Sequence, residues 1–180
     1  YSPSKEAKQV TERIISHCKN LKLEIDKKGY LKKSITDNLI NNFDNWTEIK
    51  SELESGQGSE LIEKNGTVKF KAVHSSSALC VNNFAPFKQY LDRFNFLGYS
   101  NFTEATFEKK VPTGISFPNL DFYLENEKTI IGFESKYTEF LKGKLPNKNL
   151  KKYINRKKSI KITNDSFFSL IEEYDIKTNH

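Results

Sequence analysis

Apolar residues recur at two spacings along this chain, and each spacing predicts one kind of element. Helical spacing runs through residues 4–20 and again through about residues 30–53. Alternation of apolar and polar residues begins near residue 101 and returns within residues 118–140. The pattern predicts helices in the N-terminal part of the chain and a small sheet after them.

Serine residues mark where two of the predicted helices begin. Ser4 can cap the first helix, and either Ser75 or Ser76 can cap a helix that follows the second helical stretch. Pro86 lacks an amide hydrogen, so we expect this later helix to be interrupted before Pro86 and to resume through Phe94.

Glycine and serine break the helical pattern over residues 54–60, Glu-Ser-Gly-Gln-Gly-Ser-Glu. We place a boundary in this stretch. Residues 1–55 are expected to form an N-terminal helical extension, and residues 56–180 a core with a final helix near residues 166–174. A chain of 180 residues suits one domain with such an extension.

Two apolar strands within residues 118–140 can pair as a hairpin. If the turn spans Glu125–Lys128, Phe122 lies opposite Ile131, and the neighbouring apolar residues fall on the same face. Shifting this register by one residue would mix apolar and polar side chains on both faces. The apolar pattern therefore favours the first register.

The other face of this hairpin carries charged side chains. Asp121 is expected opposite Gly132 and diagonal to Glu134, with Lys136 two residues further on. Diagonal neighbours on paired strands lie about 7–8 Å apart, so two carboxylates placed there can reach one cation. Gly132 would leave the floor of this site open.

Carboxylate and carbonyl oxygens are the ligands that Mg²⁺ takes in proteins. We expect Asp121, Glu134 and the backbone carbonyl of Ser135 to hold Mg²⁺, which lowers the pKa of a bound water and offsets charge on a phosphate. Lys136 can orient the attacking water and stabilise the transition state. The predicted activity is metal-dependent cleavage of DNA.

An ordinary ion pair on a solvated face is the competing interpretation of the same residues. An acid followed two residues later by lysine also occurs elsewhere in the chain, for example at Glu6, Asp26, Glu48 and Glu108. The triplet at Glu134 differs because it ends an apolar strand whose partner carries an aspartate. This context favours the metal site.

Charge is distributed unevenly along the chain. Residues 142–161, here called the basic segment, hold nine of the 29 basic residues and no acidic residue. The rest of the chain carries 20 basic and 23 acidic residues, so this segment accounts for the net charge of +6. Such a cluster binds polyanions or is a solvated loop. The residues expected to contact DNA phosphates are Lys151, Lys152, Arg156, Lys157 and Lys158.

Cysteine usage and hydropathy bear on where the protein works. Cys18 and Cys80 lie far apart without zinc-ligand spacing, and Cys80 stands in an apolar run typical of a buried thiol. No apolar run is long enough to cross a bilayer. We expect a cytoplasmic protein without membrane contact. The absence of methionine, even at position 1, is consistent with a fragment of a longer chain.

Several stretches resemble the PD-(D/E)xK nuclease superfamily, and in particular a group of restriction endonucleases within it. These stretches are GQGSEL (56–61), KFKAVHSSSALCVNNFAPF (69–87), FEKKVPTG (107–114), PNLD (118–121) and ESKYTEFL (134–141). The resemblance covers about residues 56–141. It departs from the motif in that Asn119 and Leu120 separate Pro118 from Asp121.

The resemblance implies an α/β fold with a restriction-endonuclease-like core, a mixed β-sheet flanked by helices. It also implies an active site of Asp121, Glu134 and Lys136, to which a further acid, Glu108 or Glu60, can contribute. Double-stranded DNA would be the substrate. A homodimer is expected, because two symmetric sites can cut both strands of a duplex.

Two functions stay open from the sequence. One is a Mg²⁺-dependent DNA endonuclease of restriction or defence type. The other is a non-catalytic nucleic-acid-binding module that keeps a nuclease-like scaffold and binds through the basic segment. The intact set of two acids and one lysine favours the endonuclease, since an inert scaffold has no reason to hold two carboxylates together. Cleavage of RNA in place of DNA is also open.

Overall fold

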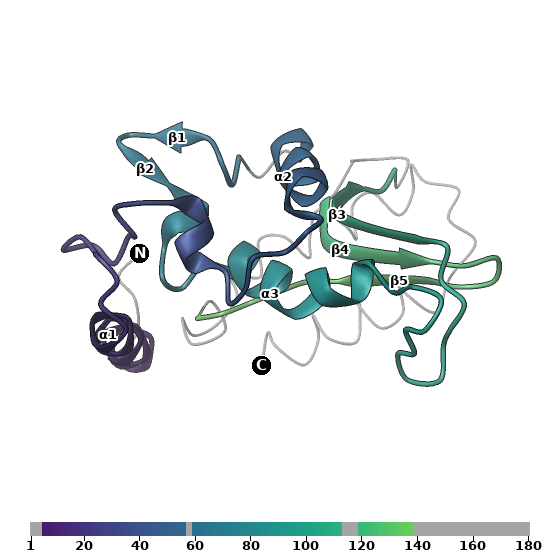
Figure 1. The fold of residues 1–180 in the computed structure, drawn as a ribbon, viewed down its shortest axis with the longest axis horizontal. Helices are drawn as coiled ribbons and strands as arrows, with labels where there is room; N and C mark the ends of the chain where they lie inside the picture. Colours follow the sequence, from purple (N-terminus) through teal and green to yellow (C-terminus); the bar gives the residue numbers. More distant parts are fainter. Residues whose placement is uncertain (1–4, 57–58, 113–118, 139–180) are drawn as a thin grey trace, which may run out of the picture. The chain divides into compact units, whose positions relative to one another are not determined.

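The computed structural model describes residues 5–56, 59–112 and 119–138, and the elements within them belong to the first of two compact units of the chain. Helices and small antiparallel sheets alternate in this unit (Figure 1). The α-helices are α1 (Lys5–Asn20), α2 (Trp46–Ser55) and α3 (Ser76–Lys88), and the 3₁₀ helices are η1 (Ile35–Asn38) and η2 (Lys69–Lys71). The strands are β1 (Glu63–Lys64), β2 (Thr67–Val68), β3 (Glu104–Lys110), β4 (Asn119–Glu125) and β5 (Ile130–Phe133).

The first and third predicted helices are present, with one correction. α1 covers the predicted stretch, while its expected cap Ser4 lies outside the described residues. α3 is capped by Ser75, whose hydroxyl accepts the amide hydrogen of Ala78 at 3.1 Å. The predicted interruption before Pro86 is wrong, because α3 runs through Pro86 and ends at Lys88. Pro86 lies in the last turn, where it removes one amide donor from a helix already held by its buried face.

The second helical stretch is not one helix. η1 begins at the cap Ser34, and a loop then separates it from α2. Asn38 explains the break, since its side-chain amide donates to the carbonyls of Phe70 (2.6 Å) and Ala72 (2.8 Å). These tertiary hydrogen bonds hold the chain at the end of η1 in place of a further helical turn. The apolar residues at helical spacing, Ile35, Leu39 and Phe43, nevertheless pack against the core.

Strands β3, β4 and β5 form an antiparallel sheet in that order, so the predicted hairpin is present. Its register differs from the predicted one by two residues, because Phe122 pairs with Phe133 and Glu125 with Ile130. Asn126 makes the difference: its amide donates to the Thr129 carbonyl (3.0 Å), and its side-chain oxygen accepts from the Lys128 amide (2.9 Å). The turn therefore spans Asn126–Thr129, one residue further along the chain than the predicted Glu125–Lys128. A shift of two residues leaves every side chain on its predicted face.

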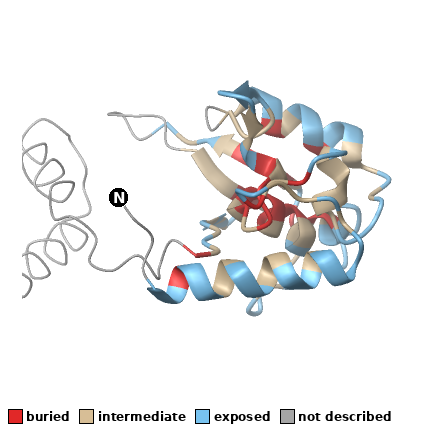
Figure 2. Cartoon of the chain, turned by 90° about the vertical axis from the view of Figure 1, so that its left-hand side faces the viewer, coloured by how far each residue is buried: buried red, intermediate tan, exposed pale blue. Residues whose placement is uncertain are grey.

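One core joins the sheet to α2 and α3. Phe122 is fully buried, and its ring stacks on that of Phe84 from α3 with centroids 4.5 Å apart. Ile49 and Leu53 bring α2 into the same cluster. The core lies between the helices and the sheet, whereas α1 is mostly exposed or partly exposed (Figure 2).

The described fold is a mixture of helices and small antiparallel sheets. Both sheets are antiparallel, so the mixed sheet implied by the resemblance is not seen within the described residues. The boundary between residues 55 and 56 stays a prediction, although α2, before it, shares one core with β3, after it. The described helices include none that is long and apolar enough to span a membrane. The basic segment and the predicted helix near residues 166–174 lie outside the described residues.

Candidate functional site

The predicted site residues meet where β4 and β5 continue past their last paired residues. Asp121 lies within β4, and Glu134, Ser135 and Lys136 follow β5 directly. Lys136 Nζ lies 2.8 Å from Glu134 Oε2 and 3.8 Å from Asp121 Oδ2. The structure therefore brings together the two carboxylates and the lysine that the hairpin pattern placed on one face.

Ser135 fixes this end of the hairpin through two hydrogen bonds. Its backbone amide donates to Asp121 Oδ2 at 2.5 Å, and its hydroxyl donates to the carbonyl of Ser76 at 2.9 Å. The first bond ties the segment after β5 to β4, and the second ties it to the first turn of α3. A serine between Glu134 and Lys136 thus orients both neighbours. The sequence had indicated only its carbonyl, as a metal ligand.

The carboxyl of Asp121 is more buried than that of Glu134. The side chain of Asp121 is 20% exposed and that of Glu134 is 52% exposed. Burial raises the pKa of Asp121, and the nearby negative charge of Glu134 acts in the same direction. The amide of Ser135 and the ammonium of Lys136 oppose this effect. Asp121 therefore lies where a second positive charge would be favourable.

Glu108 lies at the same place on β3. The pairs Phe107–Phe122 and Lys109–Leu120 stand on either side of it, so the register sets Glu108 opposite Asp121. The backbone of Glu108 is left-handed (φ +53°), and the residue is only 8% exposed. Its Oε2 accepts from the side-chain amide of Asn119 at 3.2 Å.

The surroundings of Glu108 favour its protonated form. Burial is the first cause, followed by the charge of Asp121 and then that of Glu60, and together they raise the pKa of Glu108 to about 7. Glu60 also raises the pKa of Asp121. Its side chain is 15% exposed and pairs with Lys69 at 3.2 Å. Both candidate additional acids, Glu60 and Glu108, are thus electrostatically linked to Asp121.

The sequence indicated Gly132 as part of this site, whereas the structure places another glycine, Gly56, against its acids. A Cβ atom on Gly56 would lie 2.7 Å from Cβ and 2.9 Å from Oε2 of Glu108, so a larger residue there must displace the Glu108 side chain. The prediction that Gly132 lies opposite Asp121 and leaves the floor open is wrong. Gly132 pairs with Tyr123, and a Cβ on it would lie 2.6 Å from Cδ1 of Leu120, whose side chain covers that space. The two-residue shift in register moved Gly132 away from Asp121.

Cys80 of α3 forms part of the buried surroundings of the site. It is 2% exposed, as expected for a buried thiol. Burial raises its pKa, and the charges of Asp121, Glu108 and Glu134 add to this effect in that order. The thiol is therefore held neutral, unsuited to act as a nucleophile or metal ligand.

The donor set decides which metal the site can fit. Within the described residues, no three Asp, Glu, His or Cys side chains are grouped so that they could hold a metal ion. This is unlike a structural zinc site, which needs four protein ligands. Mg²⁺ is commonly bound by one or two carboxylates and keeps several waters. Asp121 and Glu134, which already share the ammonium of Lys136, fit that second pattern.

The comparison with known families covers nearly all of the chain. A family model described as Restriction Endonuclease associating with ARP (REase-ARP) matches residues 5–178. The matched range includes the helices, the sheet, the residues of this site and the basic segment. No curated protein and no solved structure matches the chain.

Proposed function

The chain belongs to the family described as Restriction Endonuclease associating with ARP, and on this premise we propose that it is a Mg²⁺-dependent endonuclease of double-stranded DNA. We assign it to the PD-(D/E)xK superfamily, with a restriction or defence role. The observation that supports this most directly is the approach of Lys136 Nζ to both Asp121 (3.8 Å) and Glu134 (2.8 Å). Two acids and one lysine in contact at the end of two paired strands suit phosphodiester hydrolysis.

Each of these side chains has a distinct part in the proposed reaction. Asp121, oriented by the Ser135 amide, and Glu134 would hold the cation. When bound there, Mg²⁺ would lower the pKa of a water and offset the charge of the phosphate. Lys136, which is half-exposed, would donate to a phosphate oxygen and stabilise the charge that develops in the transition state.

Glu108 adds a proton-transfer group to the proposed site. Without bound metal, burial and the charge of Asp121 raise its pKa to about 7, so that it could accept or release a proton near neutral pH. A general acid or base works best when its pKa lies near the working pH. Glu60 would contribute through its charge on Glu108 and Asp121.

The partners of the chain are also part of this proposal. The basic segment would neutralise phosphates on both sides of the cut, which positions the duplex without reading its sequence. A homodimer would cut both strands. The family's description names association with ARP, and we extend that association to this chain.

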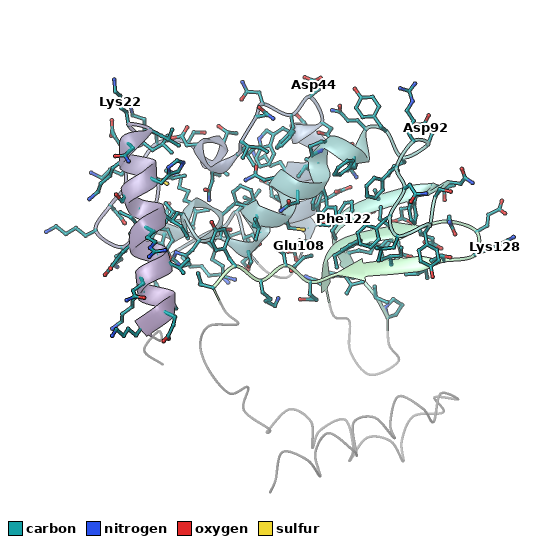
Figure 3. The ribbon with its side chains drawn as sticks, turned by 90° about the horizontal axis from the view of Figure 1, so that it is seen from below. Lys22, Asp44, Asp92, Glu108, Phe122 and Lys128 are labelled. Carbon is teal, nitrogen blue, oxygen red and sulfur yellow. The ribbon has the colours of Figure 1, made fainter. Side chains whose placement is uncertain are left out.

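Cleavage of plasmid DNA with and without Mg²⁺ tests the proposal. Asp121→Ala removes a metal ligand and Lys136→Ala removes the transition-state donor, so each should lower the cleavage rate by about 100-fold or more. DNA affinity should stay within a few-fold, because the basic segment is unchanged. Lys128→Ala is the matched control: it removes one positive charge from the turn of the same hairpin, away from Glu108 (Figure 3), and should cleave like the wild type.

Two results would contradict the proposal in different ways. If both variants cleave as fast as the wild type, Asp121 and Lys136 are not catalytic and the nuclease site lies elsewhere. If the wild type binds DNA but does not cleave it at any Mg²⁺ concentration, the protein is a binding module on a nuclease-like scaffold.

A further inference from the structure

β3 is an edge strand of the described sheet, yet its outer edge is not left to solvent. Lys88, at the end of α3, donates to the carbonyl of Ala105 at 2.5 Å. Glu52, in α2, accepts the amide hydrogen of Phe107 at 3.0 Å through Oε2. Residues 105 and 107 are two apart in a strand, so these backbone groups face the same edge. The two side chains occupy the hydrogen-bonding positions that a further strand would occupy.

Glu52 and Lys88 also bind each other. Lys88 Nζ lies 2.7 Å from Glu52 Oε1, and the lysine side chain is 6% exposed. Glu48 is a second partner of Lys88, at 2.9 Å, but its side chain is 60% exposed. A lysine this buried is held by its partners, because an unpaired ammonium in the interior is strongly unfavourable. The pair therefore forms a fixed support for β3.

This support ends immediately before Glu108. Phe107 is bound by Glu52, and the next residue, Glu108, turns into the left-handed region. Gly56, which caps α2 four residues after Glu52, packs directly against the Glu108 side chain, where a Cβ would come within 2.7 Å. Two positions one helical turn apart at the end of α2 thus hold the backbone before Glu108 and the side chain of Glu108 itself. A left-handed glutamate persists only where its surroundings impose it.

We propose that Glu52 is a positioning residue: with Lys88 and Gly56 it holds the carboxyl of Glu108 beside Asp121. This inference rests on the proposed function, since it assigns Glu52 a part in cleavage that acts through Glu108. Glu52 does not touch the reacting atoms. Glu52 fixes the position and the backbone conformation of Glu108, which is the proposed proton-transfer group.

The structural half of this inference is that Glu52 holds β3 at Phe107 and so sets the backbone of Glu108. It is tested by amide hydrogen exchange and by the backbone chemical shifts of Glu108. In Glu52→Ala the Phe107 amide should exchange about 10- to 100-fold faster, because a hydrogen bond to a charged acceptor is lost. The shifts of Glu108 should move away from left-handed values. Glu52→Gln keeps an oxygen that can accept from Phe107 and should stay within a few-fold of the wild type. Glu48→Ala removes the other partner of Lys88 and should change neither signal.

The catalytic half is that Glu52 affects cleavage only through Glu108. It is tested by a double-mutant cycle of Glu52→Ala and Glu108→Gln, with the cleavage rate measured as a function of pH. Glu52→Ala should slow cleavage and change the pH profile in the same way as Glu108→Gln. Added to Glu108→Gln, it should cause no further loss. Gly56→Ala provides a second variant that leaves the ion pair intact, and its φ of −65° is compatible with alanine. It should show the same dependence on Glu108.

Failure of the positioning role of Glu52 and failure of the proposed nuclease activity would give different results. An unchanged Phe107 amide in Glu52→Ala would overturn the structural half. Equal losses of activity from Glu52→Ala in the wild-type and Glu108→Gln backgrounds would mean that Glu52 acts through general stability, which overturns the positioning role. If the wild type does not cleave DNA, the proposed function fails and the catalytic half fails with it, while the exchange at Phe107 still decides whether Glu52 supports β3.

Discussion

The carboxyl of Glu108 should make the protein less stable as the pH rises through neutrality. Its pKa is raised from an ordinary 4.5 to about 7, chiefly by burial and then by the charge of Asp121. The folded state therefore binds a proton that the unfolded chain has already released. The resulting stabilisation is fully present below pH 4.5 and is lost as the pH rises through about 7.

The magnitude follows from the two pKa values. At 1.36 kcal/mol per pKa unit, a difference between 4.5 and about 7 corresponds to about 3 kcal/mol. Most of this, about 2.5 kcal/mol, is lost between pH 5 and pH 8. Glu108→Gln removes the titrating group and keeps its shape. The free energy of unfolding of this variant should exceed that of the wild type increasingly as the pH rises across this interval.

Urea denaturation at several pH values without divalent metal measures this difference. Trp46, the single tryptophan, lies against the ring of Phe70 with centroids 5.9 Å apart and provides the fluorescence signal. Glu127→Gln is the matched control, because it makes the same charge change on the exposed hairpin turn. Parallel stability profiles for the wild type and Glu108→Gln between pH 5 and pH 8 would refute the reasoning.

Three further predictions concern the core, the sheet and the basic segment. Phe122→Ala should lower the free energy of unfolding by about 3–5 kcal/mol in urea denaturation, because a fully buried ring is removed from an aromatic cluster; a loss below about 1 kcal/mol would contradict this packing. Gly132→Ala should cost about 1–3 kcal/mol in the same assay, since its Cβ would displace the side chain of Leu120, and an unchanged urea midpoint would show that Leu120 does not fill that space. In the basic segment, a five-glutamine variant replaces Lys151, Lys152, Arg156, Lys157 and Lys158. Its plot of log DNA affinity against log salt concentration should be shallower, with a slope smaller by about 0.9 for each phosphate that is no longer neutralised. Identical slopes in salt titrations on one duplex would mean that the segment does not bind DNA.

The hairpin shows which features the alternation of apolar and polar residues can predict. Alternation identified both strands, and the faces of Asp121 and Glu134 followed, because side-chain direction depends only on whether a position is odd or even along the strand. The exact pairing did not follow. It depends on the hydrogen bonds of Asn126 in the turn, and two registers that differ by two residues give the same apolar face.

In the helical stretch before residue 53, the apolar pattern predicted the buried residues but not where the helix ends. Its apolar spacing correctly identified Ile35, Leu39 and Phe43 as residues that pack on the core. It did not indicate that the chain leaves the helix after Asn38. That break arises from hydrogen bonds between Asn38 and carbonyls more than 30 residues away, which no local pattern contains.

The sequence by itself determined which strand faces are apolar, where the buried thiol lies and which acids and lysine share a surface, because each depends on spacing along one element. Only the tertiary structure decided what surrounds those acids. Glu108 came next to Asp121 through the pairing of β3 with β4, and Gly56 and Glu52 reached Glu108 from a helix about 50 residues earlier. The physical reason is that burial and electrostatic potential are set by neighbours in space. The raised pKa of Glu108 therefore belongs to the packed site, since the same glutamate in the Phe-Glu-Lys-Lys stretch of an unfolded chain would titrate in the ordinary range.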